Sequence, residues 1–181
     1  MAVSMLDQFK LFARYNRLMN RRILEAAAKL PRDDLIRDRG AFFKSVLGTL
    51  NHVLVGDIIW LKRFAMHLPG RKALERIDAF AQPASLDAIL CADLESLATQ
   101  RARIDAIIAD WIAGLSESDL EDCLAYRNMA GKPQHKPLAS LISHLFLHQV
   151  HHRGQATTLI SQSGVDFGDT DLLELIDDAT G

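Results

Sequence analysis

The sequence predicts an all-α protein with four long helices and a short β-hairpin or irregular crossover before the last of them. Three observations support this prediction. Apolar residues recur at helical spacing over residues 4–29, 42–68, 86–115 and 138–163. Pro or Gly lies at or soon after the end of each of these stretches, where helices stop. Residues 122–137 break the helical pattern with one glycine and two prolines, which is typical of a turn or hairpin.

The first helix carries two polar residues on its apolar side. Its stripe consists of Phe9, Phe12, Ala13, Ile23 and Ala27, and Pro31 follows it. Asn16 and Asn20 project within about 20° of Phe9 at 100° per residue. A buried amide needs hydrogen-bond partners, so the two asparagines are either ties between helices or part of a polar site.

The second helix contains a buried acid and one histidine. Asp57 falls within the main apolar stripe, where a carboxylate needs a partner such as an Arg or a Tyr hydroxyl, and we expect a structural salt bridge. His52 lies off that stripe, on a smaller apolar seam with Gly48, Val55 and Ile59. A lone histidine in such a place is more often a satisfied or partly exposed residue than a ligand.

The third helix and the crossover show little sign of chemistry. Ser85 is a plausible N-cap for a helix that starts at Leu86. His135, in the crossover, is expected to be exposed. In the acidic C-terminal tail, Asp169 or Thr170 could cap a short last helix, and the other acids are expected to face solvent.

The fourth helix carries the densest cluster of histidines, at positions 144, 148, 151 and 152. His148 and His152 fall inside the apolar stripe, whereas His144 and His151 lie at its edge. Two imidazoles one helical turn apart can reach one metal ion. The stretch is not the H-E-x-x-H motif of zinc proteases, because Gln149 follows His148 where those enzymes have the glutamate base. No Glu-x-x-His pair of the di-iron type occurs either, so a mononuclear site with nitrogen ligands remains.

Composition limits the class of protein. A length of 181 residues fits a single domain over residues 1–181, and 49% hydrophobic with 24% charged residues is an ordinary globular composition. The net charge of −2 and the lack of a Lys/Arg cluster interleaved with aromatics exclude nucleic acid as an expected partner.

The N-terminus and the cysteines bear on location. Asp7, Lys10 and Arg14 interrupt any signal-peptide region, and no run of 18 apolar residues occurs, so we expect no membrane span. Cys91 and Cys123 show no CxxC or disulfide spacing, which suits a reducing compartment. The sequence therefore predicts a cytoplasmic protein.

Three stretches together resemble the DinB family, also called DinB/YfiT-like metalloenzymes. They are FARYNRLMN at 12–20, SVLGTLNHVLVGDIIWLKRF at 45–64, and HLFLHQVHHRGQ at 144–155 with SGVDFGDTDLL behind it. The resemblance covers nearly the whole chain. It implies a four-helix bundle, usually a homodimer, with one divalent transition-metal ion per chain, Zn or Ni. The ligands it implies are His52, His148 and His152, and His52 is assigned by the resemblance alone.

The resemblance also implies a range of activities. Family members include mycothiol-dependent maleylpyruvate isomerase and bacillithiol transferases, and others are described only as metal-dependent hydrolases. We therefore expect a small-molecule substrate, with a low-molecular-weight thiol as a candidate. The alternatives are a hydrolase, a non-catalytic metal-binding bundle with a stress-related or interaction role, and histidines that bind no metal.

Residues around the ligands can be predicted as well. Ligating histidines donate their second ring N–H to an oxygen, which makes Asn16, Asn20 and Gln155 candidate partners. Arg153 projects away from the metal by the helical count and is a candidate partner of Asp57.

Overall fold

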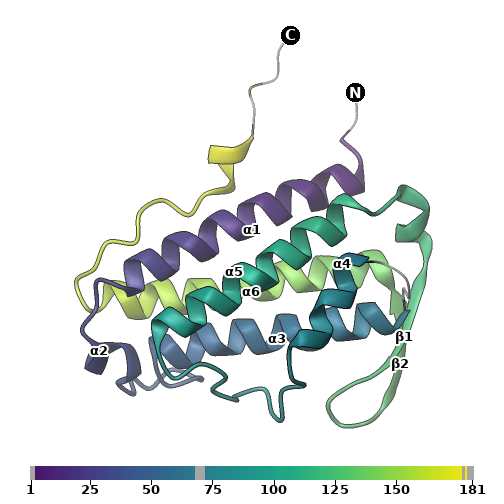
Figure 1. Cartoon of the computed structure of the whole chain (residues 1–181). Helices are drawn as coiled ribbons and strands as arrows, with labels where there is room; N and C mark the ends of the chain where they lie inside the picture. The colour runs from purple at the N-terminus through teal and green to yellow at the C-terminus, as the bar shows by residue number, and fades with distance from the viewer. Residues whose placement is uncertain (1–2, 68–71, 177, 179–181) are drawn as a thin grey trace.

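The computed structural model describes residues 3–67, 72–176 and 178, and these form a four-helix bundle with a small two-stranded sheet. The long helices are α1 (Met5–Ala27), α3 (Val46–His67), α5 (Leu94–Ala113) and α6 (Leu138–Ser161). They lie lengthwise beside one another (Figure 1), and α1 packs on α5 and α6 while α3 packs on α6 and α5. The predicted all-α fold of four long helices is confirmed.

Short elements connect the long helices. They are α2 (Arg32–Ile36), α4 (Lys72–Glu75), η1 (Arg76–Ala79), η2 (Glu117–Glu121), β1 (Cys123–Arg127), β2 (Pro133–Pro137) and η3 (Leu172–Leu175). The strands β1 and β2 pair antiparallel, with Ala125 opposite His135, and form the hairpin beside the start of α6 (Figure 1). The hairpin predicted before the last helix is thus present, and His135 is exposed as expected.

The second long helix starts four residues later than predicted. The chain turns at Lys44, whose φ of 68° lies in the left-handed region, and α3 starts at Val46. The Ser45 hydroxyl accepts the backbone N–H of Gly48 at 3.0 Å, which satisfies an N–H group that the helix start leaves free. The predicted stop at Pro69 and Gly70 lies outside the described residues.

The third long helix starts eight residues later than predicted. The side chain of Asp93 caps α5 by accepting the N–H of Ser96 at 2.8 Å, and Ser85 caps no helix. Asn51 of α3 explains the difference, because its Oδ1 accepts the N–H groups of both Leu90 and Cys91 at 2.9 Å. These bonds hold the segment against α3 in an irregular conformation.

The C-terminal tail runs back along α1 (Figure 1). Arg22 forms an ion pair with Glu174 at 2.6 Å, and the Tyr15 hydroxyl donates to the carbonyl of Thr170 at 2.7 Å. The predicted short last helix is present as η3. Its predicted caps are wrong, since Asp171 precedes it without a side-chain capping bond.

Polar residues fill the centre of the bundle. Asp57 of α3 pairs with Arg101 of α5, whose second nitrogen lies 3.0 Å from Asp105. The predicted salt bridge of Asp57 is therefore present, but its partner is Arg101 and not Arg153. Burial raises the pKa of Asp57 to about 6 against the opposing effect of Arg101.

The predicted asparagine ties lie in the same cluster. Asn20 donates to Asp105 at 2.9 Å and to Gln149 at 3.0 Å. Arg153 of α6 donates to Asn16 and, at 3.1 Å, to Asn20. Asn16 and Asn20 are therefore ties between helices.

No helix in the described part of the chain is long and apolar enough to cross a membrane.

Candidate metal centre

The packing of α3 on α6 brings three histidines together. Nε2 of His52 lies 3.1 Å from Nε2 of His148 and 3.1 Å from Nε2 of His152. His148 and His152 sit one turn apart on α6, so both rings point to the same side of the helix. His52 faces them from α3 and is only 5% exposed. These residues form the one group of three or more candidate metal ligands found among the described residues.

The spacing of the nitrogens fits one metal ion. Zinc binds imidazole nitrogen at about 2.0–2.1 Å, so two nitrogens on one ion lie about 2.8 to 3.4 Å apart, from cis-octahedral to tetrahedral geometry. The observed separations of 3.1 Å fall within this range. Three neutral imidazoles are also a donor set that zinc, nickel, copper and iron accept.

Hydrogen bonds on the far side of two rings orient their lone pairs. His52 Nδ1 lies 2.7 Å from the Leu86 carbonyl oxygen, which can only accept, so Nδ1 carries the proton. His152 Nδ1 lies 2.8 Å from Gln155 Oε1. With the proton on Nδ1 of each ring, the Nε2 atoms of His52 and His152 face each other with lone pairs at 3.1 Å. A cation bound between them would stabilise this arrangement.

Two further neighbours hold the rings in place. The Phe43 ring stacks on His52 with centroids 3.7 Å apart and an interplanar angle of 15°. Gly56 lets His148 approach α3, because a Cβ at Gly56 would lie 2.7 Å from His148 Cε1. Phe43 and the Leu86 carbonyl were missed from the sequence, because both residues were assigned to regular helix.

Of the three residues predicted to accept a hydrogen bond from a ligating histidine, only Gln155 does so. Gln155 accepts from His152 as predicted. Asn16 and Asn20 instead bond to Arg153 and Asp105 in the bundle centre. Both asparagines lie on α1, on the side of α6 away from the three histidines, and neither is hydrogen-bonded to a histidine ring.

The metal-free rings are neutral at physiological pH. Burial lowers the pKa of His52 and of His152 below the usual value, and it lowers the pKa of His148 to about 3, with the neighbouring histidines adding to the shift. Neutral imidazole is the form that coordinates metals, so protons compete weakly for this site.

Comparisons with known proteins place the chain in a family. A family model described as "DinB family" matches residues 5–180. The chain belongs to the DinB family. A DinB-like protein from Bacillus cereus ATCC 10987 is similar in structure, with a TM-score of 0.53 and 19% identity over 83% of this chain and 89% of that one. At this identity the likeness shows the fold alone. No curated protein matches this chain.

In this DinB protein the histidines face an open cavity of about 750 Å³. It lies between α3, α6, the hairpin and the turn before α3, and it is lined mainly by aromatic and apolar side chains. Among its lining residues are Phe42, Phe43, Ile59, Trp60, Arg63, Tyr126 and Met129. His144 is also in the wall and packs edge-on against Trp60, with centroids 5.1 Å apart. The site thus has room for a small molecule next to the three nitrogens.

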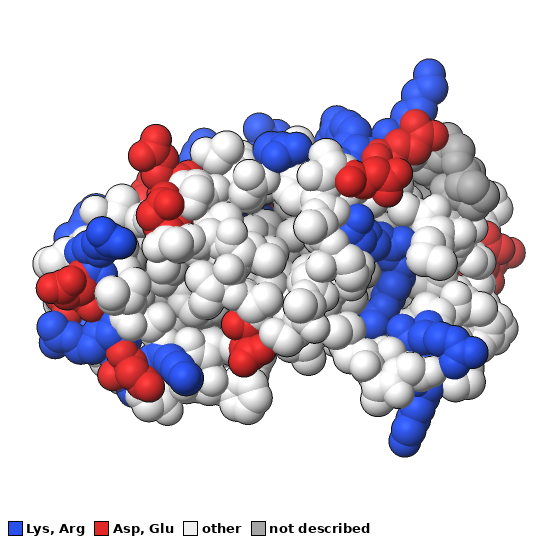
Figure 2. Space-filling view, turned by 60° about the horizontal axis from the view of Figure 1, so that its bottom comes forward, with Lys and Arg blue, Asp and Glu red and all other residues white. Residues whose placement is uncertain are grey.

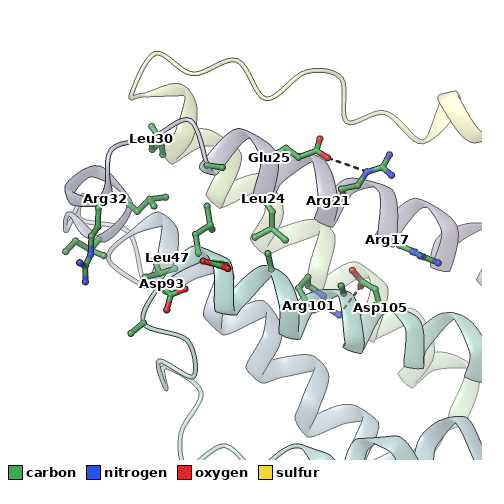
Figure 3. A pocket seen from close by; sticks show the side chains of 18 of the residues that line it. Arg17, Arg21, Leu24, Glu25, Leu30, Arg32, Leu47, Asp93, Arg101 and Asp105 are labelled. Atoms are coloured by element: carbon green, nitrogen blue, oxygen red, sulfur yellow. Dashed lines mark ion pairs between the residues drawn. The ribbon is translucent and has the colours of Figure 1, made fainter.

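A larger cavity, of about 980 Å³, lies between α1 and α5 and is separate from the histidines. Leucines and alanines make up half of its lining residues, and most of the others are arginines and acids. Figure 3 shows the ion pair of Arg101 and Asp105 beneath it and the pair of Arg21 and Glu25 along α1. No histidine or cysteine is among its lining residues, so it offers no nitrogen or sulfur ligand for a metal ion.

Proposed function

We propose that this DinB protein binds one divalent transition-metal ion through His52, His148 and His152 and acts as a metal-dependent enzyme on a low-molecular-weight thiol. One observation carries the proposal. Three Nε2 atoms, two with lone pairs oriented by hydrogen bonds on the opposite ring nitrogen, converge at the wall of an open cavity. Three protein ligands beside open space are typical of reactive metal sites, whereas structural sites are closed by four.

A bound ion would lower the pKa of a thiol or water and hold it toward the cavity. Zinc and nickel both suit three imidazoles. The described residues that line the cavity include no Asp or Glu, so no carboxylate is available there as a base. Thiol chemistry is the first candidate because DinB family members of known activity are thiol-dependent.

His144 is a candidate to receive a proton in this cavity. Its ring centroid lies 5.8 Å from that of His148, and burial together with Arg63 lowers its pKa, so it is a neutral imidazole at physiological pH. A neutral imidazole in the cavity wall can take the proton from an incoming thiol.

We also propose that the protein forms a homodimer through the outer side of α6. Leu147 and Val150 are exposed there, at 65% and 44%. Light scattering should give twice the chain mass for the wild type and the monomer mass for Leu147→Lys with Val150→Lys. A wild-type monomer would contradict the dimer and leave the metal site untouched.

Metal analysis of protein purified without a histidine tag tests the main proposal. We expect about one zinc or nickel per chain in the wild type, none in His148→Ala, and the wild-type amount in the control His135→Ala, which changes an exposed hairpin histidine. A screen of thiols with an aromatic halide as electrophile should then show turnover that His148→Ala lacks. Absence of a stoichiometric metal would refute the site. Bound metal without turnover for any thiol would favour the non-catalytic alternative.

A further inference from the structure

The charge in the histidine cavity is unusually one-sided. Among the described residues that line it, Arg63 is the one permanently charged side chain, and none is acidic. Figure 2 shows blue Lys and Arg atoms running down one side of a recess on this face of the molecule, with red Asp and Glu atoms above them. With a divalent ion at the histidines, the cavity would be positive at both ends and would favour an anionic occupant.

Arg63 is held by aromatic rings, and no acid among the described residues pairs with it. Its guanidinium carbon lies 4.7 Å from the Trp60 ring centroid and 4.8 Å from that of Tyr126. Contact with ring faces stabilises the cation and leaves the N–H groups at the edge of the guanidinium free. Burial lowers the pKa of Arg63, with only Tyr126 opposing the shift.

Three other arginines of the chain are paired with acids. Arg22, Arg76 and Arg101 each have a carboxylate within 3.0 Å. Arg63 has no hydrogen-bond or ion-pair partner among the described residues. A planar donor that is fixed, half-buried and unpaired in a cavity wall is the arrangement that binds a carboxylate through two parallel hydrogen bonds.

A row of ring contacts connects Arg63 to the ligand histidines. The Trp60 ring that Arg63 covers packs against His144 with centroids 5.1 Å apart, and the His144 ring lies 5.8 Å from that of His148. Arg63 and the three histidines line the same cavity, so one small molecule can reach both.

We propose that this cavity takes a thiol that also carries a carboxylate, and that Arg63 binds the carboxylate. The inference rests on the proposed function and narrows its substrate class. Arg63 is then a specificity-determining residue, because it separates acidic thiols from neutral thiols of equal length.

Binding to the cobalt-loaded protein tests the inference without requiring turnover. The near-ultraviolet sulfur-to-cobalt absorption band gives the Kd for 3-mercaptopropanoate and for 3-mercaptopropanol. We expect the acid to bind about tenfold more tightly than the alcohol in the wild type. The preference should fall to about one in Arg63→Met. It should be retained in part in Arg63→Lys, which keeps the charge and loses the planar fork.

A control variant separates this effect from others. Lys62→Met removes a neighbouring cation of α3 that does not line the cavity and should keep the full preference. Cobalt stoichiometry and the melting temperature show that each variant is folded and loaded.

The outcomes are distinct. If neither thiol produces the band, the thiol proposal fails and this inference falls with it. If acid and alcohol bind equally to the wild type, thiol binding stands and the role of Arg63 is refuted. A preference that persists undiminished in Arg63→Met would show that the carboxylate binds the metal, and would also overturn the inference.

Discussion

Replacing Gly56 with alanine should weaken metal binding without destabilising the metal-free fold. The new Cβ would lie 2.7 Å from His148 Cε1 and 3.2 Å from its Nδ1. Carbon atoms pack at about 3.5 to 4.0 Å, so the His148 ring must move by about 1 Å. Metal–ligand distances tolerate errors of only about 0.2 Å. Zinc affinity should therefore fall about 10- to 100-fold, as it does when the residues that orient a metal ligand are changed.

The effect of Gly56→Ala on stability should differ between the metal-free and the metal-bound protein. Without an ion, the His148 ring can turn toward the open cavity, and alanine is favoured over glycine inside a helix by about 1 kcal/mol. The melting temperature of metal-free Gly56→Ala should therefore equal or exceed that of the wild type. With an ion bound, the ring is fixed and the contact cannot relax.

Competition with a chromophoric zinc chelator measures the affinity, and circular dichroism in EDTA measures the metal-free stability. Gly154→Ala on α6 is the matched control, because a Cβ added there would meet no atom within 4 Å. It should gain stability and keep the wild-type affinity. Equal zinc affinity in the two variants would refute the assignment of His148 as a ligand held against α3.

Three further predictions concern the surroundings of the site. Gln155→Leu removes the acceptor of the His152 Nδ1–H and should lower zinc affinity about tenfold in the chelator assay, at unchanged melting temperature. Asp57→Asn breaks the buried pair with Arg101 and should lower the free energy of unfolding, measured by urea denaturation, by about 3 kcal/mol. The metal-free protein should lose stability between pH 7 and pH 5, because the unfolded chain protonates His148 near pH 6.5 and the folded chain only at about 3. His148→Gln should lose less over this range, since the opposing contribution of Asp57, whose pKa is raised, is common to both proteins.

The sequence located the histidines of α6 better than the histidine of α3. His148 and His152 lie on one apolar stripe, and helical periodicity depends only on local sequence. His52 lies on a minor seam, and which seam faces α6 depends on the packing of two distant helices. Resemblance to the DinB family was therefore needed to predict His52 beside the other two.

The contacts that support the rings could not be read from periodicity. Phe43 and Leu86 continue the apolar pattern of the helices that follow them, yet both lie in irregular segments. Lys44 interrupts the first of these with its positive φ, and Asn51 interrupts the second by binding the N–H groups of Leu90 and Cys91. Such long-range hydrogen bonds override local propensity.

The polar cluster in the bundle centre has a bearing on the metal centre although it contacts none of the histidines. Gln149 and Arg153, each next in sequence to a proposed ligand, bond to Asn20 and Asn16 of α1. These bonds fix the rotation of α6 about its axis. A ring nitrogen about 6 Å from a helix axis moves about 1 Å for a rotation of about 10°, several times the error that a metal site tolerates. The same helix thus carries the ligands on one side and, on the other, the hydrogen bonds that keep those ligands in register with His52.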